Sequence, residues 1–580
     1  MTAASAATTA HGEYEGPTKG RRRDWGVAAI LLVAGIAICA VTAAATATTA
    51  HGEYEGPATG RRSDWAVTAV LLIAGIAICA ITARRGIQPN DEGLMLQAAS
   101  RIAAGEVPYR DFWWYYPPGQ PYLLAALWKL TGPSLLDWRV VRVLADALVA
   151  VLAWKLAYRR APMWLSLLAW LAALLAMSYP SGPHPFPLAL VFALGALLLF
   201  ERHPAWAGLL VGACAAWRIE FAAYLGLGIV LALALCPSSA ERRSGLLRVA
   251  CVAVGSAALL YLPVVAMAGP GPSWDLLVKY PATEFGDYQS LPFPIAYGGP
   301  LNTSSLGGFL SDSAENLLVW WLPLVAVLGY AGSSAGLLAG FSRRRDWPVV
   351  ASIVFGLGMA HYLFVRADVF HTAPLVVVGS VLGAWAIASA LGMTASPDLP
   401  RRLVAIGGAV LAGIALAWAI VEGIDRQWLV LRQPVVALRA PAADGVRAEA
   451  RIAAPLGDAV AQARRLTAPG EPIYVLGRRA DITTSGAPLF YVLAERPNPT
   501  RYDIAAPGVV TSAPVQREII SDLRAAQPGV IVRWDSPLTA APEPNRSGQS
   551  SGVRLLDAWI AARYREDSRY GNWVILVPRG

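Results

Sequence analysis

The sequence contains little charge and almost no lysine. Of its 580 residues, 15% are charged and 56% are hydrophobic, and the mean hydropathy is +0.46. This composition excludes an ordinary soluble globular protein and predicts a membrane protein. The net charge of +9 comes from arginine, because the chain has only four lysines. The arginines cluster in short loops between apolar runs, where they orient a membrane protein, so they do not indicate nucleic-acid binding.

Cysteine is also scarce. The five cysteines all lie inside or at the ends of apolar segments: Cys39, Cys79, Cys214, Cys236 and Cys251. They show no paired spacing, and none lies in the polar C-terminal part of the chain. The pattern therefore predicts neither a disulfide framework nor a cysteine metal site.

Long apolar runs are abundant between Trp65 and about Glu422. Each is long enough, or nearly so, to cross a bilayer as a helix. We expect eleven spans, at about 66–83, 137–158, 163–179, 186–200, 205–218, 221–237, 249–268, 316–340, 348–364, 371–391 and 403–423. The predicted fold is a polytopic α-helical membrane protein, with a transmembrane domain at 66–423 and a soluble α/β domain at 424–580.

The arginine clusters predict the orientation of these spans. With eleven spans, the basic clusters all fall on one side: Arg61-Arg62, Arg159-Arg160, Arg242-Arg243, Arg343 to Arg345 and Arg401-Arg402. Basic loops favour the cytoplasm, so this side is predicted to be cytoplasmic. Residues 84–118 and 424–580 are then outside the cell membrane.

The N-terminus contains a repeat. Residues 1–40 and 41–80 align without a gap, and both contain TTAHGEYEGP. We interpret the first copy as a redundant leader left by a tandem duplication, with Val41 as an older start, or as a cleaved signal segment. A stable span in the first copy would invert every later loop, so we expect none there. Residues 41–65 are then a cytoplasmic segment.

Patterns outside the spans predict further elements. Segment 119–131 is too short to cross the membrane and is expected to be an interfacial or re-entrant helix. In the C-terminal domain we expect strands and helices in alternation, with strands at 473–477, 529–534 and 573–578 and helices at 514–526 and 553–564. The stretch 541–553 is predicted to be an exposed loop.

The first outer loop, residues 84–118, contains two adjacent carboxylates. Asp91 and Glu92 follow the first span closely, and polar groups at membrane level are costly enough to indicate function. Such a carboxylate suits a general base acting on a hydroxyl near a lipid-borne substrate. In the alternative interpretation, both residues lie in solvent in the first turn of a helix, where the helix dipole favours them.

The same loop continues with Arg110, Asp111 and the aromatic run 112–116. Aromatic side chains favour the membrane–water interface, so this run suits a surface at membrane level. Asp111 is therefore a further catalytic candidate, and Arg110 is a candidate for substrate binding.

Six more candidates for substrate binding lie at the predicted outer edge: His184, Arg218, Glu220, Arg366, Asp368 and His371. An arginine beside an outer cavity can hold a phosphate with two parallel hydrogen bonds. The alternatives stay open, namely structural ion pairs for the two arginine clusters and a loop or core role for the histidine between two prolines.

Arg142 and Asp146 are a different case. They lie one helical turn apart within a predicted span. We expect this pair to neutralise itself and to be structural.

Several of these motifs together resemble the GT-C superfamily of polytopic glycosyltransferases. They are Asp91-Glu92 after the first span, YYPPGQPYLLAALWKLTG, GLLVGACAAWRIEF and the eleven-span layout. The chain is most similar to the branch of protein O-mannosyltransferases and lipid A aminoarabinose transferases. The resemblance implies that Asp91 is the catalytic base, that Arg218 binds the carrier phosphate, and that residues 366–371 lie near the carrier site.

The leading hypothesis is therefore an inverting glycosyltransferase of the outer membrane face. Its donor would be a sugar on a polyprenyl phosphate, and its acceptor a hydroxyl of a lipid, glycan or protein. The sequence indicates no metal ligands and leaves a requirement for a divalent metal open. Two alternatives come from other classes: a transporter or lipid flippase, and a non-catalytic envelope assembly protein.

Overall fold

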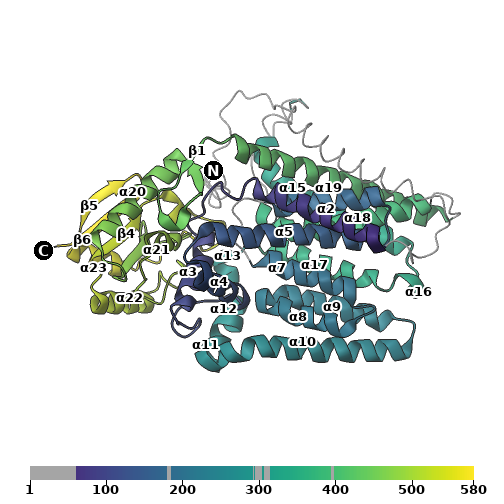
Figure 1. Cartoon of the computed structure of the whole chain (residues 1–580), viewed down its shortest axis with the longest axis horizontal. Coiled ribbons are helices and arrows are strands. Elements are labelled where there is room, and N and C mark those ends of the chain that lie inside the picture. The colour runs from purple at the N-terminus through teal and green to yellow at the C-terminus, as the bar shows by residue number, and fades with distance from the viewer. Residues whose placement is uncertain are drawn as a thin grey trace.

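A computed structural model describes residues 61–178, 185–291, 293, 304–305, 314–393 and 398–579. The repeat copy 1–40 and His184 lie outside these described residues. The chain forms a bundle of long helices and a smaller C-terminal domain that packs against one end of the bundle (Figure 1). The predicted combination of a helical membrane domain and an α/β domain is confirmed.

The bundle has a helix at each of the predicted spans. These helices are α2 (Arg61–Ala80), α5 (Leu135–Tyr158), α6 (Met163–Met177), α7 (Phe186–Leu199), α8 (Pro204–Trp217), α9 (Ile219–Leu235), α10 (Ser239–Ala268), α15 (Ala314–Ala339), α17 (Val349–Val365), α18 (Val369–Gly392) and α19 (Leu399–Arg432). A short helix, α16 (Arg343–Asp346), precedes α17.

The apolar composition of these helices fits a bilayer. Within the described residues, four are long and apolar enough to cross a membrane: α10, the part of α15 from Leu322, α18 and α19. Six shorter apolar helices accompany them. Helix α19 continues to Arg432, beyond the predicted end of the last span.

Small residues let the bundle helices approach one another closely. At Gly408 of α19, an added Cβ would lie 2.3 Å from the Gly332 carbonyl oxygen of α15. Close backbone approach of this kind favours helix association in membranes. The predicted structural pair Arg142–Asp146 is confirmed inside α5, where Nε and Oδ2 are 3.6 Å apart and both side chains are buried.

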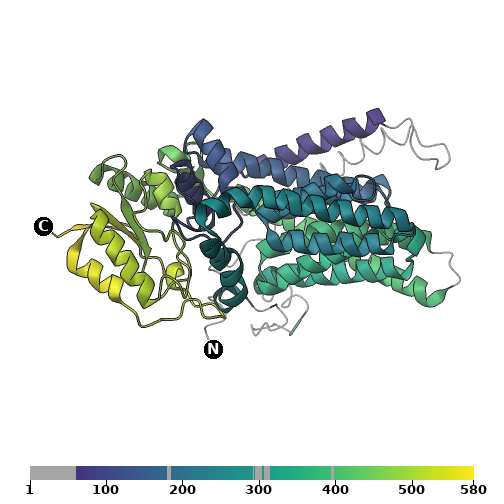
Figure 2. The ribbon, with the colours of Figure 1, turned by 90° about the horizontal axis from the view of Figure 1, so that it is seen from below.

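Short helices fill the space between the bundle and the C-terminal domain. They are α3 (Asp91–Ala103), α4 (Gly119–Thr131), α11 (Pro270–Trp274), α12 (Tyr280–Thr283) and α13 (Phe285–Gln289). Figures 1 and 2 place them at the same end of the bundle from two directions. Segment 119–131 is thus the predicted helix.

The C-terminal domain is built on a four-stranded sheet. Its strand order is β3 (Ile473–Gly477), β4 (Val530–Trp534), β6 (Trp573–Pro578) and β5 (Tyr564–Tyr570). Strand β3 runs parallel to β4, and the other neighbours are antiparallel. A separate antiparallel pair, β1 (Val435–Ala437) and β2 (Arg447–Glu449), lies beside the end of α19.

Helices cover both faces of this sheet. Along β4, Val530 and Val532 pack in the cluster that contains α20 (Ala450–Leu466) and α21 (Leu489–Ala494), whereas Ile531 packs with α22 (Ala513–Ala526) and α23 (Leu555–Arg563). Successive strand residues point to opposite faces, so an almost continuous apolar strand is covered on both sides. The five elements predicted within 473–578 are confirmed to within two residues at each end.

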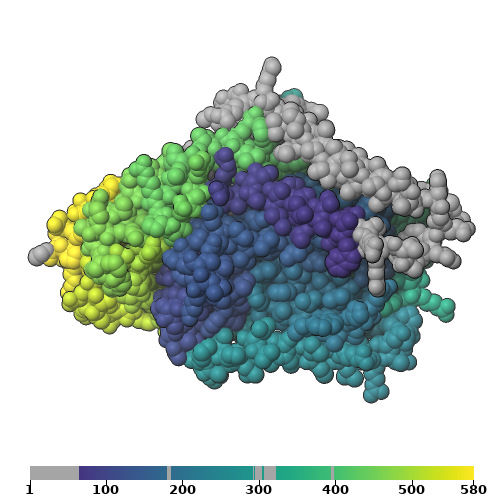
Figure 3. All heavy atoms as spheres, viewed as in Figure 1, coloured from purple at the N-terminus to yellow at the C-terminus, as the bar shows by residue number. Residues whose placement is uncertain are grey.

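The two domains share one hydrophobic core. Leu94 and Met95 of α3 belong to the same buried cluster as Leu489 and Phe490 of α21. In Figure 3 the surface of the early residues meets that of the C-terminal domain without a gap on the face shown. The domain is therefore packed directly onto the first loop.

Candidate functional site

Asp91 begins α3, and the C-terminal domain fixes the backbone in front of it. Asn90 donates a hydrogen bond from Nδ2 to the Asp91 carboxylate at 2.9 Å, and its Oδ1 accepts one from the Gly486 amide at 3.1 Å. The Leu489 amide donates to the Pro89 carbonyl at 3.1 Å. The position of Asp91 thus depends on residues from both ends of the chain.

The Glu92 carboxylate forms a buried ion pair with Arg139. Its two oxygens accept from Nε and Nη2 of Arg139 at 2.7 and 2.8 Å, and both side chains are buried. Arg139 also donates to the carbonyls of Ala83 and Gly86, each at 2.9 Å. A carboxylate held on both oxygens in this way favours a structural role over the predicted role in proton transfer.

An aromatic cluster lies close to Asp91. The hydroxyls of Tyr115 and Tyr116 are 2.9 Å apart. The Tyr115 ring contacts the rings of Tyr280 and Phe285, with centroids 5.4 and 5.7 Å away. Tyr109 donates to the Tyr116 carbonyl at 2.8 Å and so holds the end of the aromatic run in place.

Tyr116 is influenced by the charges of three predicted site residues. Burial raises the pKa of Tyr116, and the hydrogen bond with Tyr115 lowers it. The positive charges of Arg218 and Arg366 also lower this pKa, and the negative charge of Asp91 raises it. The three charged groups, which are far apart in sequence, therefore lie within electrostatic range of Tyr116.

Arg218 occupies the break between α8 and α9, where the backbone is extended at φ −148° and ψ 104°. Its Nη2 lies 2.6 Å from Glu220 Oε1, and its guanidinium lies 5.1 Å from the centre of the Tyr362 ring. Among the described residues, its buried Nε has no hydrogen-bond partner. Because a buried guanidinium donor is costly to leave unbonded, this nitrogen marks a place for a ligand atom.

Arg366 occupies a similar break, between α17 and α18. Its Nη1 donates to the Gln289 carbonyl at 2.6 Å, its Nη2 lies 2.9 Å from Glu543 Oε1, and its Nε lies 3.4 Å from Asp368 Oδ2. Burial alone would lower the pKa of Arg366, but the charges of Glu543, Asp368 and Asp91 raise it above its ordinary value. The arginine stays charged at the junction of three segments.

Asp368 and His371 complete this corner. The carboxylate accepts from the His371 amide and lies 2.7 Å from its ring Nδ1, so Asp368 caps the start of α18. The His371 ring lies against Tyr362, with centroids 4.6 Å apart. Tyr362 therefore links the Arg218 side of the site to the Asp368 side.

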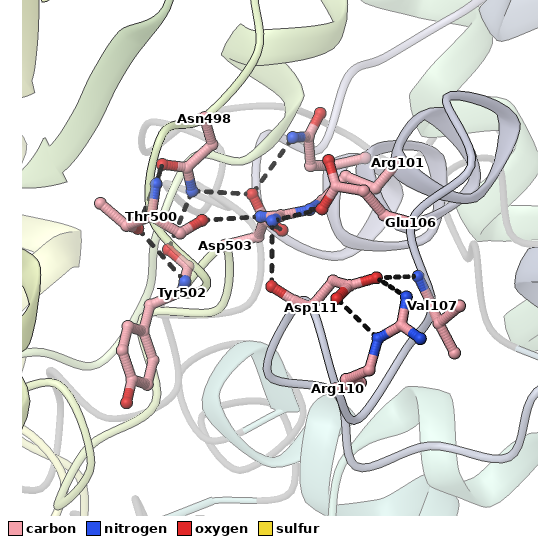
Figure 4. A network of polar contacts seen from close by, with 10 residues as sticks. Arg101, Glu106, Val107, Arg110, Asp111, Asn498, Thr500, Tyr502 and Asp503 are labelled. Atoms are coloured by element: carbon pink, nitrogen blue, oxygen red, sulfur yellow. Dashed lines mark hydrogen bonds and ion pairs between the residues drawn. The ribbon is translucent and has the colours of Figure 1, made fainter. Parts of the chain in front are cut away.

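Arg110 and Asp111 belong to a different network, shown in Figure 4. The two side chains pair through Nη2 and Oδ2 at 2.8 Å, and Asp111 also accepts from the Val107 amide at 2.7 Å. The hydrogen bonds from Arg110 lower the pKa of the Asp111 carboxyl. The aspartate closes a tight loop at Tyr109, whose φ is 72°, which points to a structural role.

The centre of this network is Arg101, which ties the first loop to the C-terminal domain. Its Nη1 lies 2.9 Å from Asp503 Oδ2 and donates to the Thr500 carbonyl at 2.8 Å (Figure 4). Its Nε donates to Glu106 at 2.8 Å. These contacts hold the first loop against the C-terminal domain.

The structure brings together Asp91, Arg218, Arg366 and their close neighbours. It separates from them the two other carboxylates that the sequence favoured, Glu92 and Asp111. His184 is outside the described residues.

Sequence reasoning missed three residues of the site, Tyr116, Tyr362 and Glu543. The aromatic run was a signal for Tyr116, but nothing in the sequence pointed to Glu543. The prediction of an exposed loop at 541–553 is confirmed for Pro542, Pro544, Arg546 and residues 549–552, and is wrong at Glu543 and Ser547. Glu543 and Ser547 are buried there, because Glu543 reaches Arg366 across the domain interface.

The sequence analysis leaves open whether the protein requires a divalent metal. Within the part of the chain that the structure describes, no three His, Cys, Asp or Glu residues are grouped to hold a metal ion.

Comparisons with known proteins complete this description. No protein-family model and no curated protein matches the sequence. Among solved structures, the chain is similar to ArnT from Cupriavidus metallidurans bound to undecaprenyl phosphate, with 13% identity, 90% of this chain and 98% of that chain covered, and a TM-score of 0.49. The apo form of ArnT from the same organism has 13% identity and a TM-score of 0.47, with 89% of this chain and 98% of that chain covered.

Proposed function

We propose that this protein is a membrane glycosyltransferase that moves a sugar from a polyprenyl-phosphate donor to an acceptor hydroxyl. One observation supports the proposal: a carboxylate, Asp91, and two arginines, Arg218 and Arg366, lie within electrostatic range of the same tyrosine, Tyr116. A base next to a pair of cations is what transfer from a phosphate leaving group requires.

In this mechanism Asp91 is the general base. It accepts the proton of the acceptor hydroxyl while the hydroxyl oxygen attacks the anomeric carbon of the sugar. A new bond forms between the anomeric carbon and the acceptor oxygen as the bond from that carbon to the phosphate oxygen breaks. The configuration at the anomeric carbon is therefore inverted. The bonding electron pair leaves with the polyprenyl phosphate.

The arginines stabilise this leaving phosphate. Arg218 is the first candidate, because its buried Nε has no hydrogen-bond partner among the described residues. Arg366 adds a second positive charge from the neighbouring helix break. Charged hydrogen bonds to phosphate are among the strongest in proteins, and donors fixed before the reaction stabilise charge as it develops.

We also propose that the site faces the outside of the cell membrane. The opposite end of the bundle carries the arginine-rich loops, where Arg160 lies 2.5 Å from Asp346 and Arg159 lies 2.8 Å from Glu201. The positive-inside rule favours the cytoplasm for that end. The end with Arg218 and the C-terminal domain is then extracytoplasmic.

The test is transfer by the purified full-length protein in lipid nanodiscs. Radiolabelled sugars on undecaprenyl phosphate, the lipid named for the similar ArnT structure, are offered with a panel of lipid, glycan and peptide hydroxyls. Asp91→Asn keeps the size of the side chain but cannot act as a base, so transfer should fall at least about 100-fold. Asp275→Asn, which changes an exposed carboxylate on a neighbouring short segment, is the matched control.

Two outcomes would contradict the proposal. The first is no transfer of any sugar by the unchanged protein. The second is near-normal transfer by Asp91→Asn with the protein folded and inserted, which would assign the base to another group.

A further inference from the structure

The C-terminal domain contains a second concave surface, remote from Tyr116. It is a cavity of about 510 Å³ beside helix α23 that extends from the carboxyl ends of the parallel pair β3–β4 to β5 and the end of β6. Six arginines line it, together with only two carboxylates, Asp557 and Glu566: Arg478, Arg479, Arg533, Arg554, Arg565 and Arg579. The volume is in the range of small-molecule sites.

The fold explains why the arginines converge. Arg478 and Arg479 directly follow β3, Arg533 lies near the end of β4, and Arg554 precedes α23. The carboxyl ends of parallel strands meet at one edge of a sheet, which is where open α/β sheets bind ligands. Four arginines from three separate segments therefore face one hollow.

Neighbouring carboxylates do not neutralise this cluster. Arg478 lies 3.1 Å from Asp535, and Asp481 lies 2.6 Å from Arg479 and 3.7 Å from Arg554. Asp535 is shared with Arg569, which also pairs with Glu566. Arginines therefore outnumber carboxylates even when these neighbours are included.

Arg533 is the most informative member. It lies on the central strand β4, on the face that packs toward α22 and α23, as Ile531 does. Its Nε is buried, and among the described residues it has no hydrogen-bond partner. An unmet guanidinium donor on a core strand is costly unless a ligand oxygen supplies the missing bond.

We propose that this cavity binds a phosphate-bearing ligand, such as a sugar phosphate or a phosphate group on a polymer. A single arginine can satisfy a carboxylate, whereas a phosphate offers three oxygens and close to two negative charges, which match several arginines at once. Figures 1 and 2 place α23 and β5 at the end of the molecule away from the bundle. The phosphate is therefore one in solution or on a polymer, not a headgroup of the membrane that holds the helices.

The test measures binding to the full-length protein by isothermal titration calorimetry. The probes are glucose 1-phosphate, inorganic phosphate, glucose, galacturonic acid and vesicles containing phosphatidylglycerol. We expect glucose 1-phosphate and inorganic phosphate to bind in a salt-dependent manner, while glucose does not bind and galacturonic acid binds at least tenfold more weakly.

Variants locate the binding. Arg533→Gln and Arg554→Gln should each raise the Kd for glucose 1-phosphate at least about tenfold. Arg554 is exposed, so its variant tests the site even if Arg533→Gln fails to fold. Arg517→Gln removes the same charge from the exposed side of α22 and should leave the Kd unchanged.

Four results would overturn the proposal. They are no binding of either phosphate probe, equal binding of galacturonic acid, binding of the vesicles alone, and the same loss of affinity in Arg517→Gln. None of them depends on sugar transfer, so they are separate from a failure of the proposed function.

Discussion

The base of the first loop and the α8–α9 break hold buried arginines in different ways. At the base of the loop, Arg139 spends its donors on Glu92 and on backbone carbonyls. At the breaks, Arg218 keeps a buried Nε without a partner among the described residues, and Arg366 takes its partners from three different segments. Burial alone therefore does not identify a functional arginine. Arg218 differs from both Arg139 and Arg366 in keeping a buried donor that the described part of the fold has not used.

The largest effect is expected when one partner of the buried Glu92–Arg139 ion pair is removed. Glu92→Gln leaves Arg139 as an unpaired buried charge, so the free energy of unfolding should fall by about 3–5 kcal/mol. Denaturant unfolding in detergent measures this change. Replacing both partners, as Glu92→Leu with Arg139→Met, should recover most of the loss. A catalytic Glu92 would instead abolish transfer in the double variant while the protein stayed stable.

The second prediction concerns Arg218 at the α8–α9 break. Arg218→Ala should raise the KM for the lipid donor about 10- to 100-fold, because a charged hydrogen bond contributes about 1.5–3 kcal/mol. The unfolding transition should barely move. Steady-state kinetics with the labelled donor give the KM. Arg202→Ala, an exposed arginine at the other end of α8, is the control, and an equal rise in its KM would contradict the assignment.

The third prediction sharpens the role of the C-terminal domain. Glu543→Gln keeps a hydrogen-bonding oxygen near Arg366 but removes the charge, so we expect the KM for the donor to change roughly fivefold, for about 1 kcal/mol. Glu518→Gln, on exposed α22 of the same domain, should have no effect on the KM. A lower melting temperature with an unchanged KM would make Glu543 a docking contact only.

The smallest effect is expected at the exposed pair Arg110–Asp111. The pKa of Asp111 is lower in the folded protein than in the unfolded chain. Its contribution to loop stability is therefore present above the ordinary carboxyl pKa and is lost as the pH falls through the lowered value. The hydrogen-exchange protection factors of residues 105–116, which compare each rate with the intrinsic rate at the same pH, should fall below about pH 4. Asp111→Asn should remove that pH dependence, and an unchanged profile would contradict it.

The sequence predicted the parts of the molecule whose signals are local. The apolar runs located the bundle helices, and short apolar runs at 473–477 and 573–578 located β3 and β6 to the residue. Polar residues at the predicted outer ends of the spans singled out Asp91, Arg218 and Arg366, whose roles in the site stay predictions. Helix α19 exceeded its prediction because a helix continues through polar residues once it leaves the bilayer.

Contacts between distant residues could not be predicted in this way. The partner of Glu92 is 47 residues away, and Glu543 meets Arg366 across 177 residues. Neither partner carries a local pattern, since Arg139 lies in an ordinary helix and Glu543 in a loop rich in turn residues. The ranking of Asp91 above Glu92 as a base thus gains its physical support only from the folded chain.

The hydrogen bonds in front of Asp91 also have a consequence for how the protein is made. Asn90 is held by Gly486, 396 residues later in the chain, and at Gly93 an added Cβ would lie 2.1 Å from the Leu489 amide nitrogen. During synthesis the bundle helices emerge long before residues 486–489 exist. The first loop is therefore made, together with the helices that flank it, before its contacts at residues 486–489 can form. Residues 486–489 must be synthesised before the carboxylate is set in place, so a ribosome that stops before them releases a membrane protein without an assembled site.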